Sequence, residues 1–255
     1  MSIPETRIKE LVAHRWDLAS ETFDTHASHG IQSERERNAW KNTLKKVFPG
    51  GRLKILDVGC GTGELSLLFA EMGHEVTGID LSEKMLEKAK AKARARGMNL
   101  VFEKGDAESP AYEPASFDVV INRHLLWTLP NPRLAVANWK KVLREGGMAV
   151  IIDGIWDDGT PGTKLRRAAG CLGTLIIERR DPRKGHCGYS EELKSMLPDV
   201  RGPPPEKVEM YLENAGFSGI GNLPLTEILE IQKQNMPFRE RISFNFQYYL
   251  VHGRK

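Results

Sequence analysis

The glycine-rich stretch at residues 53–63 constrains the fold of this chain more than any other segment. Residues 54–58 form a short, mostly apolar run, which is followed by three closely spaced glycines, Gly59, Gly61 and Gly63. A helical pattern begins at Glu64, so the stretch predicts a strand, a tight loop and a helix. Glycines let a backbone turn with positive φ and approach a bound molecule, and the first N–H groups of a helix are unpaired. We therefore expect a ligand at this strand end.

Two acidic residues indicate the kind of ligand. Asp57 stands just before the glycines, whose Gly-x-Gly-x-Gly spacing differs from the Gly-x-Gly-x-x-Gly of dinucleotide sites. A carboxylate at this position would repel a diphosphate, but it can pair with a ligand that carries an ammonium group. A second predicted strand, residues 75–80, ends in Asp80, roughly 20 residues after Gly59, the spacing at which a carboxylate grips a ribose diol. A plain strand-to-helix connection is the alternative for the glycine loop, and the second acid makes it less favoured.

Four segments in this order resemble the class I S-adenosylmethionine (SAM) dependent methyltransferases, in particular the small-molecule branch of the ubiquinone-biosynthesis type. The segments are Asp57-Val-Gly-Cys-Gly-Thr-Gly63, Gly78-Ile-Asp-Leu-Ser82, Gly105-Asp-Ala-Glu108 and Phe117-Asp-Val-Val-Ile-Asn122. The resemblance is strong over about residues 53–150 and weaker beyond them. It implies SAM as the cofactor, and it gives Asp106 the role of holding the adenine amino group. The cofactor-binding residues that it implies are Asp57, Gly59, Cys60, Gly61, Gly63, Asp80, Leu81, Asp106, Ala107 and Asn122.

Alternation of strand and helix patterns predicts an α/β fold with a Rossmann-like parallel sheet and helices on both faces. The predicted strands are residues 54–58, 75–80, 99–103, 117–122, 148–152, 217–222 and 243–251. The last strand alternates and is rich in aromatic residues, so we expect it to pair antiparallel at the sheet edge. The predicted helices within this pattern are residues 64–72, 83–96, 133–144 and about 205–214.

Two segments fall outside the sheet pattern. Residues 1–52 predict an amphipathic helix over 5–23 and a second helix that Ser33 and Glu36 open with a capping box. The insertion at about residues 153–205 keeps only helical spacing. The chain therefore divides into an N-terminal helical lid segment, residues 1–52, and a SAM-binding domain, residues 53–255, with a cap at about 153–205. We expect the lid and the cap to close over the carboxyl ends of the strands.

Three residues are candidates for catalysis. His124 follows the fourth strand, where the family's substrate side begins, and it is a base or orienting group, with a structural hydrogen-bonding role as the alternative. His29 lies between the two N-terminal helices and either faces the pocket or is a solvated loop histidine. Tyr189, in the insertion, is expected to close the pocket.

Charge, hydrophobic runs and cysteine content limit the partners and the location that we expect for this protein. The net charge of the 255 residues is only +3, which gives no field that favours nucleic acid or a membrane surface as a partner. No apolar run approaches the roughly 18 residues of a membrane span, and the first 20 residues are too charged for a signal sequence, so we expect a cytoplasmic location. The three cysteines are not spaced for disulfides, and no Cys/His cluster has metal-ligand spacing, so we predict no metal. The sequence gives no indication of the oligomeric state.

The sequence thus predicts an enzyme that transfers the methyl group of SAM to a small soluble acceptor by in-line displacement. Two alternatives stay open. One is an enzyme of the same fold that uses SAM with a non-methyl outcome, such as cyclisation or release of methylthioadenosine. The other is a SAM-binding module without catalysis, which the intact set of motifs disfavours.

Overall fold

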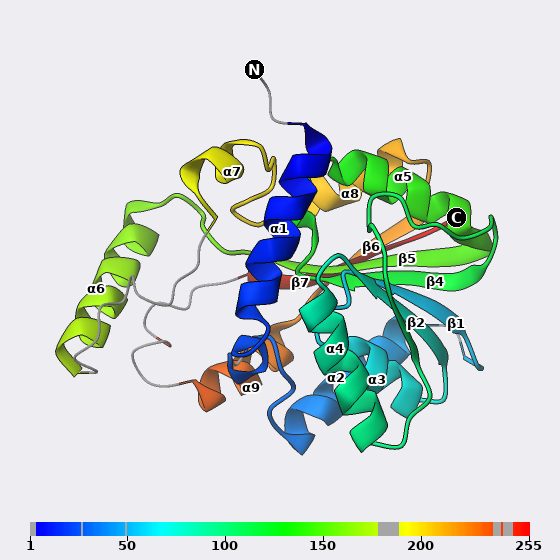
Figure 1. The fold of residues 1–255 in the computed structure, drawn as a ribbon, viewed down its shortest axis with the longest axis horizontal. Coiled ribbons are helices and arrows are strands. Elements are labelled where there is room, and N and C mark those ends of the chain that lie inside the picture. Colours follow the sequence, from blue (N-terminus) through cyan, green and yellow to red (C-terminus); the bar gives the residue numbers. More distant parts are fainter. Residues whose placement is uncertain (1–3, 27, 49, 178–188, 237–240, 242–246) are drawn as a thin grey trace.

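The computed structural model describes residues 4–26, 28–48, 50–177, 189–236, 241 and 247–255, and the structural statements below concern these residues. Within them, one seven-stranded sheet has the order β3-β2-β1-β4-β5-β7-β6 (Figure 1). Strands β1 to β5 pair in parallel, whereas β7 pairs antiparallel with both β5 and β6, which confirms the expected antiparallel last strand. The expected position of that strand at the sheet edge is wrong, because β6 pairs with its outer side and forms the edge. The strands are β1 Lys54–Val58, β2 Glu75–Asp80, β3 Val101–Lys104, β4 Phe117–Arg123, β5 Leu143–Ile155, β6 Ser218–Pro224 and β7 Gln247–Arg254.

Helices cover both faces of the sheet, as the alternating pattern predicts. On one face, α5 and α8 bury residues such as Trp139 and Leu212. On the other face, α2, α3 and α9 bury Trp40 and Phe69 (Figure 1). Complete burial of side chains of this size stabilises the fold by roughly 1.5–3 kcal/mol each. The helices described are α1 Glu5–Ala19, α2 Glu34–Val47, α3 Glu64–Glu71, α4 Glu83–Ala95, α5 Pro132–Val142, α6 Pro161–Ile177, α7 Glu191–Ser195, α8 Pro205–Asn214 and α9 Thr226–Asn235.

The capping box that the sequence predicts opens α2 and also fixes α2 in the fold. The Glu36 N–H donates to the Ser33 side chain (3.2 Å), and the Glu36 carboxylate accepts from the Gln32 N–H (2.9 Å). The second carboxylate oxygen of Glu36 accepts from the Gln232 amide on α9 (2.9 Å). This buried carboxylate therefore caps one helix and joins it to another.

Helix α1 runs across the carboxyl ends of the strands (Figure 1). Its Asp17 carboxylate accepts from the Ser82 hydroxyl (2.6 Å) and the Lys84 N–H (3.2 Å) at the start of α4. Ile8 and Val12 on α1 pack in one apolar cluster with Tyr189, Leu193 and Leu197 of the cap. Parts of the N-terminal segment and the cap thus meet over the strand ends.

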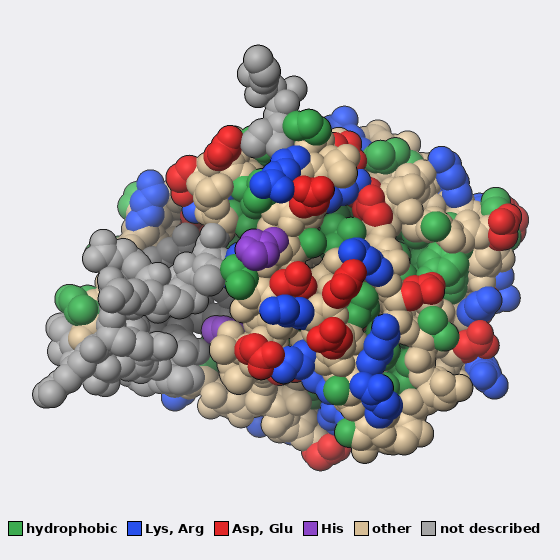
Figure 2. All heavy atoms as spheres, viewed as in Figure 1, with side chains coloured by type: hydrophobic (Ala, Val, Ile, Leu, Met, Phe, Trp, Pro, Cys, Tyr) green, Lys and Arg blue, Asp and Glu red, His purple; other side chains and the backbone are tan. Residues whose placement is uncertain are grey.

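The described face that carries α1 and α4 has mixed charges. Figure 2 shows acidic and basic side chains interspersed over these helices. Several of them are paired across short distances, including Lys88 with Glu21 (2.9 Å) and Lys104 with Glu83 (2.7 Å). This face therefore presents no large patch of a single sign. None of the helices in the described part of the chain has the length and apolar character needed to span a membrane.

Several element bounds differ from the sequence prediction. The first helix ends at Ala19, and Phe23–Thr25 forms a separate short 3₁₀ turn. β5 already begins at Leu143, where Leu143 pairs with Phe117 ahead of a register shift. Residues 145–147, which the prediction left between a helix and a strand, therefore lie inside the strand. Helix α9 was not predicted. Residues 243–246 of the predicted last strand lie outside the described residues, and β7 extends to Arg254.

We expect Gly63→Ala to destabilise the fold more than Gly97→Ala, its matched control. Both glycines have positive φ, which costs other residues about 1–2 kcal/mol. A Cβ at Gly63 would also stand 2.9 Å from the Phe102 ring and 3.0 Å from Ala89, whereas one at Gly97 meets no atom within 4 Å. Overpacking adds about 1–3 kcal/mol. Denaturant unfolding measures both losses, and equal losses would contradict the tight contact at Gly63.

Candidate active site

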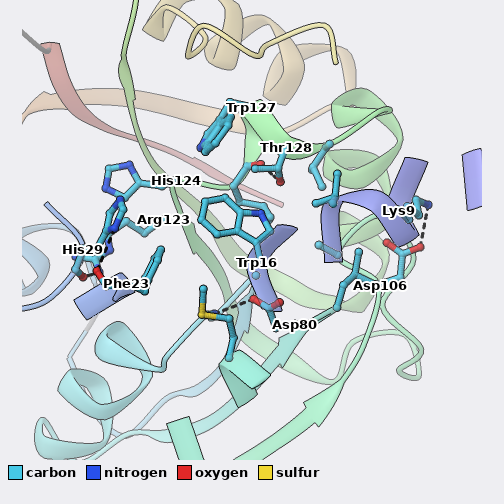
Figure 3. A pocket seen from close by; sticks show the side chains of 18 of the residues that line it. Lys9, Trp16, Phe23, His29, Asp80, Asp106, Arg123, His124, Trp127 and Thr128 are labelled. Carbon is cyan, nitrogen blue, oxygen red and sulfur yellow. Dashed lines mark hydrogen bonds and ion pairs between the residues drawn. The ribbon is translucent and has the colours of Figure 1, made fainter. Parts of the chain in front are cut away.

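A cavity of about 450 Å³ lies at the carboxyl ends of the central strands, and we call it the main cavity (Figure 3). Its volume is within the usual range for small-molecule sites, about 300–1,000 Å³. One end, the acidic end, is lined by residues that follow β2 and β3: Asp80, Leu81, Gly105, Asp106 and Ala107. The other, the aromatic end, is lined by Trp16, Phe23, His29, His124, Trp127 and Trp156.

The glycine loop after β1 lets a ligand approach the backbone. Gly59 (φ +68°) and Gly61 (φ +55°) both line the main cavity. A Cβ at Gly59 would stand 2.5 Å from a methyl carbon of Leu125, so only glycine fits there. Gly63 (φ +79°) is not among the residues that line the cavity, and it starts α3 against Phe102. The loop thus contains two glycines at the cavity and one that serves packing.

Asp80 connects the glycine loop to the end of β2. Its carboxylate accepts from the Gly61 N–H (2.9 Å) and the Ser82 N–H (2.8 Å). Removal from bulk water raises the pKa of Asp80, although both backbone donors oppose that shift. A carboxylate fixed in this way keeps further lone pairs that can accept hydrogen bonds from a ligand in the main cavity.

Asp106 interacts with α1 through Lys9. The Lys9 ammonium contacts Asp106 (2.9 Å), the buried Glu108 (2.6 Å) and Glu5 (2.6 Å). Burial opposes the charge on Lys9, but its hydrogen bonds to Glu108, Glu5 and Asp106 prevail and raise its pKa. The sequence analysis did not identify Lys9, because its partners at Asp106 and Glu108 lie in a distant loop.

A second, smaller cavity of about 30 Å³ adjoins the glycine loop, and we call it the side recess. Asp57, Cys60 and Thr62 line it, and Gly59, Gly61, Arg123 and His124 line both the recess and the main cavity. The Asp57 carboxylate accepts from the Ser66 hydroxyl (2.6 Å), and burial raises its pKa to about 6. Burial also raises the pKa of the Cys60 thiol.

His29 lies at the aromatic end, stacked on Phe23 with ring centroids 4.2 Å apart. Its Nδ1 is 3.2 Å from the Phe23 carbonyl, so Nδ1 carries the proton and Nε2 carries the lone pair. Desolvation, followed by the charges of His26 and Arg123, lowers the pKa of His29 to about 3. The imidazole is therefore neutral at physiological pH.

Hydrogen bonds and ring stacking hold the His124 side chain. Its Nε2 is 3.3 Å from the Tyr248 hydroxyl, and the ring also bonds to the backbone of Ser28. The rings of His124 and Tyr248 are stacked at 5.2 Å, and the backbone of His124 has a φ of +59°, which is uncommon outside glycine. Desolvation and the neighbouring Arg123 keep its pKa well below the usual range. This histidine is held in a fixed orientation.

Three predicted site residues line neither the main cavity nor the side recess: Gly63, described above, Tyr189 and Asn122. Tyr189 lies behind the aromatic wall, where its hydroxyl accepts from Trp16 Nε1 (3.1 Å) and its ring contacts Trp127 (5.3 Å). Asn122 is fully buried, and its side-chain oxygen and nitrogen have no hydrogen-bond partner in the described part of the chain. Their predicted roles in catalysis and cofactor binding stay predictions. Within the described residues, no three His, Cys, Asp or Glu side chains are arranged to hold a metal ion.

Comparisons with known proteins agree with this geometry. A family model described as a methyltransferase domain matches residues 56–151. A ubiquinone biosynthesis O-methyltransferase of Azoarcus sp. (strain BH72) is 42% identical over 96% of this chain and 93% of its own length. A malonyl-[acyl-carrier protein] O-methyltransferase of Erwinia pyrifoliae is 34% identical over 58% of this chain and 53% of its own length. Six further ubiquinone biosynthesis O-methyltransferases align with this chain over 39% to 57% of their own length.

Solved structures share the fold. The [4+2]-cyclase SpnF has a TM-score of 0.63 at 19% identity, covering 96% of this chain and 94% of SpnF. A Haemonchus contortus phosphoethanolamine N-methyltransferase 2, solved with S-adenosylhomocysteine, has a TM-score of 0.68 at 16% identity, covering 97% of this chain and 60% of that one. Identities this low show the fold alone. The sequence relatives, however, are closer, and together with the matched methyltransferase domain they establish that this chain belongs to the class I SAM-dependent methyltransferases, enzymes whose cofactor is SAM.

Proposed function

We propose that this chain transfers the methyl group of SAM to an oxygen atom of a small, flat and largely apolar acceptor. The observation that carries the proposal is the main cavity, which joins an acidic end to an aromatic end with two neutral histidines. Flat apolar molecules pack well against aromatic rings. The Azoarcus relative, which is named an O-methyltransferase and aligns over most of both chains, supports oxygen as the attacked atom.

The acidic end suits the adenosine part of SAM. Asp80 would accept from the ribose hydroxyls and Asp106 from the adenine amino group, with Leu81 and Ala107 against the base. Gly59 and Gly61 leave room for the methionine part beside their backbone. In this proposal Cys60 contributes to the side recess, whereas Gly63 and Asn122 support the loop and the strand from outside the main cavity.

The aromatic end suits the acceptor. When bound, SAM supplies a methyl group on a sulfonium, which departs as a neutral thioether. The chain's own contribution is to hold the acceptor oxygen in line and to exclude water, and such positioning provides roughly 7–11 kcal/mol in favourable systems. Nε2 of His29 would accept the hydroxyl proton as positive charge develops on the attacking oxygen. An imidazole whose protonated form has a pKa of about 3 is still a stronger base than the oxygen of the methyl ether that forms.

His124 and Tyr189 have positioning roles in this proposal. Tyr248 and the Ser28 backbone both bond to the His124 ring, so this ring would form a fixed wall against which the acceptor packs and would not remove its proton. Tyr189 holds Trp16 in the aromatic wall. Residues 1–52 and the cap at about 153–205 would act as the lid, since α1 and the described residues around α7 meet over the strand ends.

Product analysis tests this function. With SAM and a panel of small phenols, we expect mass spectrometry to find S-adenosylhomocysteine and a phenol that carries one extra methyl group. Asp80→Ala should weaken SAM binding by about 10- to 100-fold, the scale of lost hydrogen bonds to a charged group. Glu87→Ala, which removes an exposed carboxylate from α4, should bind SAM like the wild type. Release of methylthioadenosine without S-adenosylhomocysteine would contradict methyl transfer.

SAM binding should depend on pH through Asp57. In the proposed complex the ammonium of SAM pairs with the Asp57 carboxylate, which faces the charges of Asp80 and Arg123 and has a pKa of about 6. Below pH 6 the carboxyl is protonated in the free protein, so the dissociation constant should rise about tenfold for each pH unit. Above that pH affinity should be level until the amino group of SAM loses its proton, near about 8. Calorimetric titrations from pH 5 to 8 measure this, and Asp57→Asn should remove the dependence around pH 6.

Lys9→Gln should destabilise the protein, because the fully buried Glu108 loses its cationic partner. We expect a loss of about 1.5–3 kcal/mol in the free energy of unfolding, the scale for hydrogen bonds to charged groups. Arg7→Gln is the matched control on the same helix, since it removes an exposed ion pair with Glu10 and should change stability by about 0.5 kcal/mol or less. Equal effects of the two variants in denaturant unfolding would show that Lys9 does not stabilise Glu108.

A further inference from the structure

Arg123 is the cation at the junction of the main cavity and the side recess. It is the last residue of β4, and it lines both spaces (Figure 3). Its guanidinium donates to the His29 carbonyl through Nη2 and lies over the Trp40 ring, 5.7 Å from the ring centroid. The contacts to α2 and to the loop before it hold the side chain in place.

Arg123 shares the side recess with Asp57 but forms no ion pair with a carboxylate in the described part of the chain. Among the described residues, no Asp or Glu oxygen is recorded within the 4.0 Å of an ion pair with Arg123, and Nη1 is buried without a hydrogen-bond partner. Its other polar neighbours are neutral groups: the His29 carbonyl and the Tyr248 hydroxyl. A cation removed from bulk water without an anion is costly, so this site favours a ligand that brings a negative charge.

Asp57 supplies the opposite sign in the same recess. Its buried carboxylate and Arg123 both line the recess next to Gly59 and Gly61. A ligand that enters from the main cavity therefore meets an acid and a guanidinium within a space of about 30 Å³. That combination fits the two charged groups of an α-amino acid, with its ammonium toward Asp57 and its carboxylate toward Arg123.

We propose that Arg123 binds the α-carboxylate of SAM and makes the enzyme discriminate between SAM and decarboxylated SAM. This inference rests on the proposed cofactor site and adds a residue that the family motifs did not include. Guanidinium groups match carboxylates in geometry, and the donor left unpaired on Nη1 adds capacity for such a contact. Anchoring both groups of the amino acid would fix the chain that leads to the sulfonium, and with it the direction in which the methyl group faces the aromatic end.

Decarboxylated SAM is the probe that isolates this contact, because it retains the ammonium, the sulfonium and the adenosine. By titration calorimetry we expect wild-type protein to bind SAM about 10- to 100-fold more tightly than decarboxylated SAM, the scale of a charge-assisted hydrogen bond. Arg123→Gln should bring this ratio to within about twofold of unity, mainly by weakening SAM. Arg123→Lys, which keeps the charge without the planar donors, should give an intermediate ratio and serves if Arg123→Gln does not fold.

Lys9→Gln is the matched control, since it removes one positive charge from the opposite end of the same cavity. It should leave the ratio of the two dissociation constants at the wild-type value. A wild-type protein that binds both ligands equally, or an Arg123→Gln variant that keeps the ratio, would overturn the inference and leave the proposed function intact. An Arg123→Gln variant that binds SAM normally but raises the KM of the acceptor would also overturn it, because Arg123 would then belong to the acceptor. Failure of wild-type protein to bind SAM or S-adenosylhomocysteine would refute the proposed function itself.

Discussion

Parallel pairing of β1 with β2 on one side and β4 on the other is the constraint on which the rest of the structure depends. The register aligns Asp57 with Gly78 and with Ile121, so the three strands end at one level. Residues far apart in the sequence, such as Gly59, Asp80 and Arg123, therefore reach one edge of the sheet. One apolar layer on each face of the sheet holds the strands in place. The loops that leave the strand ends are therefore anchored close to one another.

Several ionisable side chains at the carboxyl ends of these strands are buried. Asp57, Asp80 and Glu108 each have a raised pKa, mainly because of desolvation. Lys9 compensates Glu108 directly, whereas Asp57 and Arg123 face a recess and compensate one another only at longer range. A ligand that pairs with these buried charges would therefore add to the stability of this region. Sites that bind ligands commonly carry such a cost in the stability of the free protein.

Local motifs made the sheet and the residues of the acidic end predictable. The glycine loop, Asp80 and Asp106 could be identified because each lies at or just after the end of a strand within a short, characteristic segment, and Gly59, Gly61, Asp80 and Asp106 all line the main cavity. Asn122 and Arg123 show where such reasoning stops. The motif pointed to Asn122, but a strand alternates its faces: Val119 and Ile121 pack on the side of α2, and Arg123 follows them to reach Trp40. Lys9 and the bond between Trp16 and Tyr189 depend on how α1 docks, which no local pattern encodes.

Helix α1 comes first in the chain, but the residues that hold it come much later. Its bond from Lys9 to Asp106 spans 97 positions, and that from Trp16 to Tyr189 spans 173. During synthesis α1 leaves the ribosome long before either partner exists, and contacts of such separation carry a large loop-closure cost until the sheet has formed. We therefore expect the sheet and its glycine loop to form before the helix that covers them docks.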